Sequence, residues 1–203
     1  MVRQAKLSDL SNIAAVHMKC FPDSFSTCLG GKLLEKFYSE YIKDVPELFL
    51  VCEDEKKNIV GFCMGYYMEK NDYSRSFLKH NFFSICFKFL GRLLCGDKRA
   101  WKKLKKNKDV KWVLKDEEIH KIPNEKKGDL LSICVLNTYR GKGYASDLIN
   151  SYEQVLAKRG RKICILSVET DNGRGVGFYE KQGYTVYGEA GKIKRTYAKK
   201  LEA

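Results

Sequence analysis

One stretch of this 203-residue chain, residues 130–146, reads LLSICVLNTYRGKGYAS and decides which fold the chain can adopt. Its apolar first half, up to Val135, predicts a buried strand, and Gly141 and Gly143 predict a tight loop after it. The next residues predict an amphipathic helix that stops at Gly160, because apolar side chains recur at helical spacing: Leu148, Ile149, Tyr152, Val155 and Leu156. A strand, a glycine loop and a helix are therefore expected in direct succession.

The junction of this loop and helix predicts a binding site for an anion. The first amides of a helix have no partner within it, and the helix dipole favours negative charge at that end. Glycine lets the backbone approach a phosphate closely and adopt positive φ. We therefore expect the amides around Gly143 to bind a diphosphate or polyphosphate. The structural alternative is a glycine turn that only joins strand to helix.

Two common phosphate-binding motifs do not fit this loop. A P-loop needs Ser or Thr directly after its Gly-Lys pair, but Lys142 is followed by Gly143. A dinucleotide fingerprint needs glycine at position 146, where this chain has Ser146. The pattern that does fit is Arg140-x-x-Gly143-x-Ala145.

This pattern resembles the Arg/Gln-x-x-Gly-x-Gly/Ala motif of the GNAT superfamily of N-acetyltransferases, whose loop amides hold the pyrophosphate of acetyl-CoA. The resemblance implies acetyl-CoA as co-substrate, with the strand backbone against its pantetheine arm. The cofactor-binding residues that it implies here are Ile133, Cys134, Val135, Arg140, Gly141, Lys142, Gly143, Tyr144, Ala145 and Ser146.

A second block, at 162–184, resembles the same family. A strand rich in β-branched residues ends at Glu169 and is followed by Asn172 and by Phe178-Tyr179-Glu180-Lys181-Gln182-Gly183-Tyr184. The resemblance implies that Asn172, Phe178 and Lys181 bind the cofactor and that the Tyr179 hydroxyl lies near the thioester sulfur. A phenol with a pKa of ~10 can protonate a departing thiolate, so Tyr179 is the expected catalytic acid. The alternative role for Tyr179 is that of an ordinary half-buried aromatic residue.

The second block also departs from the family pattern. Gly173, Gly175 and Gly177 crowd the start of the expected helix, and each glycine inside a helix costs ~1 kcal/mol relative to alanine. We therefore expect this helix to begin late, near residue 176, after a flexible loop. In the first block, Asn137 stands where the family often has proline.

The expected chemistry is direct attack of an amine on the thioester, without an acyl-enzyme. None of the cysteines has a neighbouring histidine in sequence that would activate it as a nucleophile. Asp129, just before the expected strand, is the best carboxylate for deprotonating the amine. Asp129 could equally be a surface residue, with a water chain taking the proton instead.

Composition indicates a single globular domain over 1–203, with 44% hydrophobic and 31% charged residues. The eight cysteines include no Cys-x-x-Cys pair, and several lie in apolar strand patterns, as free cysteines of cytoplasmic proteins do. The three histidines have no metal-ligand spacing, so no metal site is expected. The first residues run directly into a strand pattern, so we expect no signal peptide and a cytoplasmic protein.

The order of expected elements indicates an α/β protein with a mixed sheet and resembles the GNAT acyl-CoA N-acyltransferase fold. A strand near 2–5 precedes a helix from Asp9 to Phe21 with Ser8 as N-cap, and a second helix ends near Lys43. An antiparallel hairpin covers 47–53 and 59–68, and two terminal strands are expected near 185–189 and 192–201.

A helical basic insert is expected at about 72–128. Residues 77–94 give an amphipathic helix that is too short and too interrupted to span a membrane. The tract Lys98–Lys108, rich in lysine and containing Trp101, is expected to be helical as well. The two could simply pack on the core and face solvent, or the tract could bind an anionic membrane surface or a nucleic acid. A homodimer is also left open.

The acceptor is expected to bind at the loop between the first two helices. It offers Phe21, Ser24, Phe25 and Ser26, a mixture of aromatic and hydrogen-bonding side chains that suits a polar amine. An N-cap in a serine-rich connection is the alternative for the two serines. The net charge of +13 disfavours a cationic acceptor and favours an anionic one that carries an amine, such as a nucleotide-linked amino sugar.

These observations predict an acetyl-CoA-dependent N-acetyltransferase that acts on a primary amine, with a small-molecule acceptor favoured. The alternative is a non-catalytic module that keeps the fold and attaches to membrane or nucleic acid through its basic insert.

Overall fold

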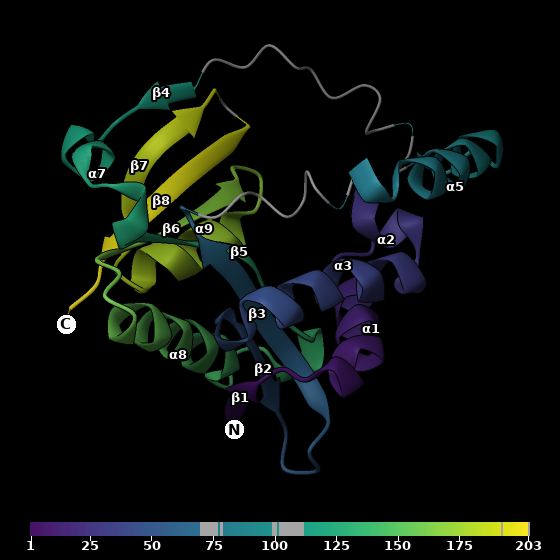
Figure 1. The fold of residues 1–203 in the computed structure, drawn as a ribbon, viewed down its shortest axis with the longest axis horizontal. Coiled ribbons are helices and arrows are strands. Elements are labelled where there is room, and N and C mark those ends of the chain that lie inside the picture. Colours follow the sequence, from purple (N-terminus) through teal and green to yellow (C-terminus); the bar gives the residue numbers. More distant parts are fainter. Residues whose placement is uncertain (70–76, 78, 99–100, 102–111, 192, 203) are drawn as a thin grey trace.

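The computed structural model shows an eight-stranded sheet with helices on both faces (Figure 1). It describes residues 1–203 except 70–76, 78, 99–100, 102–111, 192 and 203. The strands are β1 (Val2–Gln4), β2 (Phe49–Glu53), β3 (Ile59–Tyr67), β4 (Trp112–Leu114), β5 (Lys127–Val135), β6 (Ile163–Glu169), β7 (Thr185–Ala190) and β8 (Lys194–Lys200). The α-helices are α1 (Leu10–Cys20), α2 (Phe25–Leu29), α3 (Gly31–Asp44), α5 (Phe82–Leu94), α7 (Glu117–Lys121), α8 (Tyr144–Lys158) and α9 (Gly173–Lys181).

The strands follow the order β1-β2-β3-β5-β6-β8-β7-β4. All neighbouring pairs are antiparallel except β5 and β6, which are parallel because α8 crosses between them. The expected mixed sheet is confirmed.

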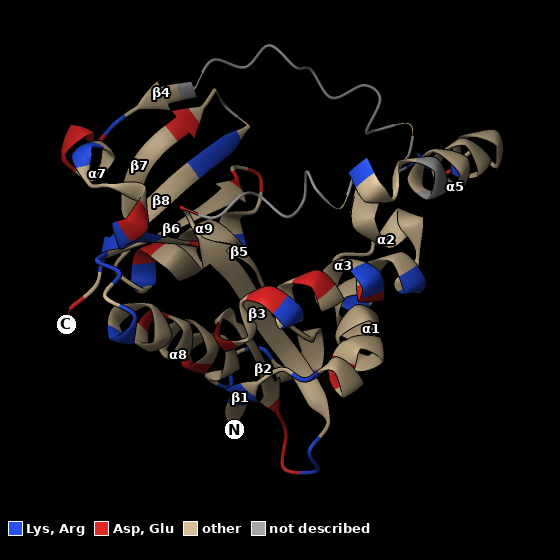
Figure 2. Ribbon diagram, in the orientation of Figure 1, with Lys and Arg blue, Asp and Glu red and all other residues tan. Residues whose placement is uncertain are grey.

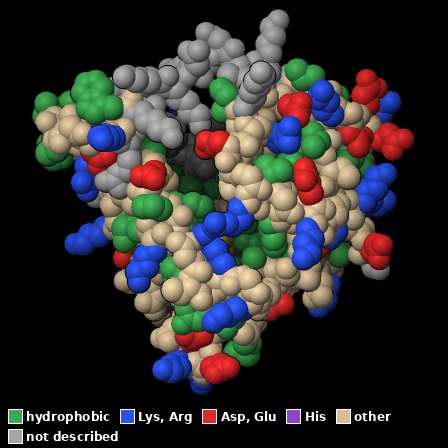
Figure 3. All heavy atoms as spheres, turned by 180° about the vertical axis from the view of Figure 1, so that it is seen from behind, with side chains coloured by type: hydrophobic (Ala, Val, Ile, Leu, Met, Phe, Trp, Pro, Cys, Tyr) green, Lys and Arg blue, Asp and Glu red, His purple; other side chains and the backbone are tan. Residues whose placement is uncertain are grey.

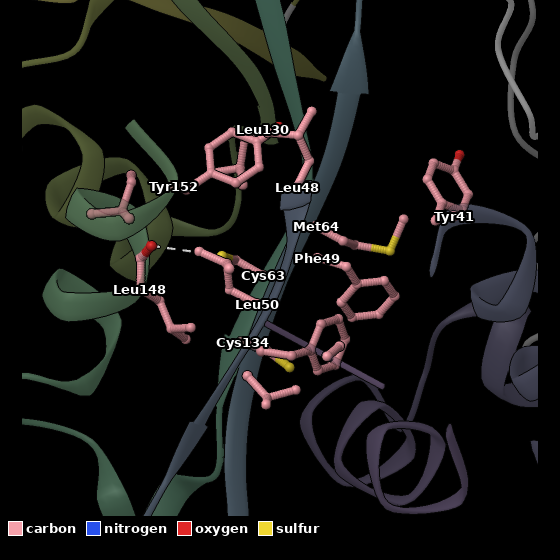
Figure 4. Packing of buried hydrophobic residues seen from close by; sticks show 14 of the residues in the cluster. Tyr41, Leu48, Phe49, Leu50, Cys63, Met64, Leu130, Cys134, Leu148 and Tyr152 are labelled. Carbon is pink, nitrogen blue, oxygen red and sulfur yellow. Dashed lines mark hydrogen bonds between the residues drawn. The ribbon is translucent and has the colours of Figure 1, made fainter. Parts of the chain in front are cut away.

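The main core fills both faces of the central strands. Figure 4 shows Leu148 and Tyr152 of α8 on one side of β3 and Tyr41 of α3 on the other. All three side chains are essentially inaccessible to solvent. The β2–β3 hairpin closes across the charged turn 54–58, which is visible at its tip in Figure 2. The buried cysteines on these strands behave as small hydrophobic residues, as expected: Cys52, Cys63, Cys134 and Cys164.

The start of the chain differs from the prediction in one cap. Ser8 does not cap the first helix; it lies inside a 3₁₀ turn, Leu7–Asp9, that precedes α1. The Asp9 carboxylate accepts the Lys6 amide at 2.8 Å and is also held by Arg3 at 2.7 Å. Asp9 is thus held by residues that precede it, and its side chain makes no capping hydrogen bond to α1.

The insert is not purely helical. Helix α5 covers Phe82–Leu94, the later part of the helix expected at 77–94, and β4 follows it and pairs with β7 at the edge of the sheet. The insert also ends earlier than residue 128, because β5 begins at Lys127. Most of the basic tract Lys98–Lys108 lies outside the described residues. No helix among the described residues is long and apolar enough to cross a bilayer.

Candidate active site

The sheet splits open between β5 and β6. Their parallel pairing covers four registered pairs, from Lys127–Ile163 to Leu130–Leu166. Beyond this point β5 remains paired with β3 up to Val135, and β6 remains paired with β8. The described ladder thus leaves the β6-facing edge of residues 131–135 without a strand partner. A ligand with amide groups can pair with these backbone groups.

A β-bulge accompanies the split. Met64 and Gly65 of β3 are adjacent, but they pair with Ser132 and Leu130, so Leu131 is an extra residue in β5. Such a bulge bends its strand and increases the local twist. Here it lies where β5 turns away from β6.

Two residues from neighbouring elements pack closely against the backbone of β5 next to the bulge. A Cβ atom on Gly65 would lie 1.8 Å from the Asp129 carbonyl oxygen, so only glycine fits there. The buried Tyr152 hydroxyl of α8 donates to the same carbonyl oxygen at 2.8 Å. Helix α8 is therefore fixed directly to the strand at the point of the split.

The loop after β5 presents the expected anion site. Gly141 and Gly143 have φ of +75° and +89°, and a Cβ at either position would meet no atom within 4 Å. The first α8 amide that bonds back along the helix is Asp147, to Gly143 at 3.0 Å. The preceding amides, from Tyr144 to Ser146, thus point out of the helix end. The glycines are needed for their positive φ and leave open space in front of these amides.

Side chains around the loop have specific partners. Arg140 donates from Nε to the Val135 carbonyl at 3.1 Å, which fixes the loop on the last residue of β5. Ser146 accepts a hydrogen bond from Gln182 at 3.1 Å and so connects the start of α8 to the end of α9. The Lys142 ammonium lies 5.3 Å from the centre of the Tyr139 ring. The predicted residues from 133 to 146 thus lie together along one end of the split.

Helix α9 begins at Gly173, not near residue 176 as predicted. The Asn172 side chain caps it by accepting the Gly175 amide at 3.0 Å. A cap of this kind stabilises a helix start by ~1 kcal/mol, which offsets the cost of about one glycine. The predicted cofactor ligand Asn172 therefore has a structural role at this position.

Tyr179 of α9 lies half-buried on the face of the sheet that α8 covers. Its ring contacts Tyr184 and Tyr197, with centroid distances of 6.0 and 6.4 Å. Tyr184 in turn donates to Glu153 of α8 at 2.9 Å, which locates this aromatic group beside α8. Among the described residues, the Tyr179 hydroxyl has no hydrogen-bond partner. Burial raises the pKa of Tyr179 well above its usual range, so the phenol stays protonated.

Two predicted cofactor ligands lie beside Tyr179 on α9. Phe178 packs against the Tyr179 ring, and Lys181 is exposed.

Asp129 lies within β5, not before it as predicted, because β5 begins two residues earlier. It is in register with Tyr66 and Ile165, and residues in register share a sheet face. Ile165 belongs to the small core under α7, on the face opposite Tyr179. Asp129 and Tyr179 therefore lie on opposite faces, and the split is the place where both faces can reach one ligand.

The expected acceptor loop is partly helical. Ser24 is the N-cap of α2 and accepts the Thr27 amide at 3.1 Å. Phe25 packs edge-to-face on Phe89 of α5 at 5.4 Å, while Phe21 contacts the His17 ring at 5.0 Å. Ser26 is half-buried in the first turn of α2. The capping role considered for Ser24 is the one that the structure shows.

A buried histidine lies behind this loop and was not identified from the sequence. His17 Nδ1 lies 2.5 Å from the Tyr38 hydroxyl, and Nε2 lies 3.4 Å from Ser24 Oγ. The Ser24 hydroxyl donates to Thr27 Oγ1, so it can only accept from His17, and Tyr38 must then donate to Nδ1. Burial lowers the pKa of His17 to about 4, so the ring is neutral at neutral pH. Residues 17 and 38 lie on separate helices, so no sequence spacing connects them.

Within the described residues, no group of three or more His, Cys, Asp or Glu side chains is arranged to hold a metal ion. The geometry of the site consists instead of a split sheet, a glycine loop and a helix N-terminus, which together can hold an extended phosphate ligand.

Comparisons with known proteins agree with this arrangement. The model of the Acetyltransferase (GNAT) family matches residues 98–184. N-alpha-acetyltransferase 30 of Schizosaccharomyces pombe is 31% identical over 61 residues, which cover 30% of this chain. The match spans 41% of the length of that relative.

Solved structures share the fold over nearly the whole chain. Naa20 of Chaetomium thermophilum, in complex with a bisubstrate analogue, superposes with a TM-score of 0.56 at 17% identity, covering 99% of this chain and 86% of that one. The PaiA N-acetyltransferase of Thermoplasma acidophilum, in complex with coenzyme A, also gives 0.56 at 17% identity, covering 98% of each chain. Residues 98–184 are therefore similar to the Acetyltransferase (GNAT) family, and the chain shares its fold with these acetyltransferase structures.

Proposed function

We propose that this protein is an acetyl-CoA-dependent N-acetyltransferase that acts on a primary amine. The observation that carries the proposal is the junction of the β5–β6 split with the N-terminus of α8. The unpaired edge of β5 suits the amides of a pantetheine arm, and the open space beside Gly141 and Gly143 suits a pyrophosphate. The matching family and the fold of the coenzyme A complex support the same ligand.

Binding of the pantetheine arm would involve a backbone carbonyl that already accepts a hydrogen bond. The Val135 carbonyl accepts from Arg140 Nε at 3.1 Å, so a pantetheine amide that uses this carbonyl must share it or displace the guanidinium. A carbonyl has two lone pairs and can accept both donors. Arg140, exposed at the loop, would then lie beside the phosphates.

Tyr179 is proposed as the general acid. Bound acetyl-CoA would supply a thioester. The nitrogen of the substrate amine attacks its carbonyl carbon, so that a C–N bond forms and the C–S bond breaks. The departing sulfur needs a proton, and the Tyr179 phenol is protonated and has no other hydrogen bond among the described residues. Asp129, on the opposite face, is the proposed acceptor of the amine proton, directly or through water.

The acceptor class is proposed from two sources. The polar residues of the α1–α2 segment, Ser24 and Ser26, would suit a small polar amine, although the Ser24 hydroxyl is already engaged in capping. The relative named N-alpha-acetyltransferase 30 and the Naa20 structure favour the α-amine of a peptide instead. Both acceptor classes present a neutral primary amine to the thioester, so one chemistry serves both.

The test is turnover with a panel of amines, monitored by release of free CoA thiol. The panel contains amino sugars, nucleotide-linked amino sugars, diamines and short peptides with free or blocked N-termini. The proposal expects CoA release that depends on one acceptor class and on Tyr179. A direct titration with CoA runs in parallel. CoA binding with no turnover on any amine would support the non-catalytic module instead.

A matched pair of variants localises the acceptor. Ser26→Ala removes a hydroxyl that is not used as a cap, and it is expected to raise KM for the acceptor without changing KM for acetyl-CoA. Ser39→Ala serves as the control, because Ser39 bonds to its own helix at the Lys36 carbonyl. Equal acceptor KM values for the two variants would remove Ser26 from the proposed acceptor site.

A further inference from the structure

Helix α5 packs against the α2–α3 region through two of its side chains. Ile85 is buried with Leu29 and Leu33 of the α2–α3 region, and Phe89 packs on Phe25. These contacts hold α5 against α2, and Figure 1 shows the helix projecting from the body of the molecule. Its main contact among the described elements is with α2.

Part of the α5 surface is apolar and open to solvent. Exposed fractions are 58% for Phe82, 82% for Phe87, 56% for Leu90 and 80% for Leu94. We call these four residues the α5 apolar face. Phe82, Leu90 and Leu94 recur at multiples of four residues, and Phe87 flanks this row. Figure 3 shows hydrophobic side chains gathered at the projecting end of the molecule, and Figure 2 shows α5 with little charge. Single exposed hydrophobic residues are ordinary, but four on one helix indicate a contact surface.

Positive charge accompanies this face. Residues 77–108 contain ten Lys or Arg and one acidic residue, Asp97, and so account for +9 of the net charge of +13. Among the described residues, Lys79, Arg92 and Lys98 are exposed next to the helix. Trp101 follows the helix and is 48% exposed. Tryptophan is enriched at the interface between membrane and water.

We propose that the α5 apolar face docks on an anionic lipid surface. The four side chains would enter the boundary between headgroups and acyl chains, while the exposed Lys79, Arg92 and Lys98 would remain among the lipid phosphates. An apolar face and a positive charge each bind membranes weakly, and their combination on one short segment makes binding selective for anionic lipid. The helix is too short to span the bilayer, so the contact is peripheral.

Two other occupants fit less well. A second copy of the chain would bring two segments of charge +9 together across the interface, and this repulsion disfavours a dimer through α5. The phosphates of a nucleic acid would pair with the lysines and arginines. They would not cover the apolar side chains of Phe87 and Leu94, which would remain in water. Of these three occupants, the lipid surface satisfies both the charge and the apolar face of the segment.

The test is co-sedimentation of the full chain with vesicles of phosphatidylcholine, with and without about 30% phosphatidylserine. The wild-type protein is expected to bind the anionic vesicles. It is expected to dissociate from them at about 0.5 M salt, where surface charges are screened. Phe87→Ser/Leu94→Ser is expected to weaken binding at least tenfold. The control is Leu7→Ser/Val113→Ser, which removes two other exposed apolar side chains, 51% exposed each, and should change binding less than twofold.

Three results would overturn the proposal. The first is equal binding by wild type and the Phe87/Leu94 variant, with circular dichroism showing both folded. The second is a wild-type dimer, found by light scattering, that this variant dissociates. The third is tight binding to single-stranded RNA in place of vesicles. Turnover on a soluble amine is measured in the same samples, and the proposed acetyl transfer predicts that the α5 variant keeps it.

Discussion

The Tyr152 hydroxyl donates to the Asp129 carbonyl oxygen at 2.8 Å and joins α8 to β5 beside the bulge. Tyr152 is completely buried, and Gly65 lies against both groups, since a Cβ there would be 1.8 Å from the carbonyl oxygen and 2.1 Å from the hydroxyl. Three elements, α8, β3 and β5, therefore meet at one backbone oxygen. The position of the helix N-terminus relative to the split depends on this contact.

Gly65→Ala should destabilise the protein by at least about 2 kcal/mol, because the added methyl group cannot avoid the Asp129 carbonyl. Chemical denaturation with urea measures the change. Gly91→Ala is the control, since a Cβ there meets no atom within 4 Å and α5 is helical at this residue. It should raise stability by up to ~1 kcal/mol. A Gly65→Ala protein as stable as wild type would show that β5 can shift freely at the bulge.

Gly143→Asp should weaken CoA binding at least tenfold, equivalent to ~1.4 kcal/mol, because it places a carboxylate where the phosphates are proposed to lie. Gly160→Asp is a close control. Gly160 has φ of +73°, again with open space around it, but it follows the opposite end of the same helix. Both variants carry the same charge and similar backbone strain. Calorimetric titration with CoA should separate them, and equal affinities would contradict the proposed phosphate site.

Tyr179→Phe should lower kcat by ~10²-fold and leave CoA affinity nearly unchanged, because only the proton donor to sulfur is removed. Tyr184→Phe serves as its control. It removes the hydroxyl of the neighbouring ring, which bonds to Glu153, and should reduce stability more than kcat. Steady-state kinetics and thermal unfolding of both variants distinguish chemistry from packing. Full kcat in Tyr179→Phe would remove the general-acid role.

His17 should make the protein less stable in mild acid. Burial lowers its pKa to about 4 from an ordinary 6.5, so below pH 6.5 the unfolded chain binds a proton that the native protein does not. Stability is therefore lost as the pH falls from 6.5 to 4, by about 2.5 kcal/mol at pH 4.5. Urea unfolding at pH 7 and pH 4.5 measures this loss. The loss of unfolding free energy between pH 7 and pH 4.5 should be smaller by about 2.5 kcal/mol in His17→Gln. It should be unchanged in His80→Gln, because the His80 imidazole is exposed.

The sequence predicts the strand, loop and helix of 127–158 well because each is encoded locally, by an apolar run, by glycines and by helical periodicity. The same holds for the hairpin of β2 and β3. The start of α9 differs from the prediction because glycine propensity alone does not include the cap that Asn172 provides. The short strand β4 was missed because its stability comes from pairing with β7, which is distant in the chain.

The details of the candidate site were harder to predict for a related reason. The bulge at Leu131 is a mismatch between two strands and appears in neither strand alone. The contact of His17 with Tyr38 depends on how α1 packs against α3. Asp129 was placed just outside the strand, although its pairing with Tyr66 and Ile165 puts it inside.

The four registered pairs between β5 and β6 have a mechanical consequence. They are the hydrogen-bonded connection between one half of the sheet, β1-β2-β3-β5, and the other half, β6-β8-β7-β4. A ligand that pairs with the open edge of β5 and also contacts the β6 side would act as additional rungs of this ladder. Opening of the two halves would then become rarer, and amide hydrogens of β5 and β6 beyond Leu130 and Leu166 would exchange with solvent more slowly. The co-substrate would in this way complete the sheet that the chain leaves divided.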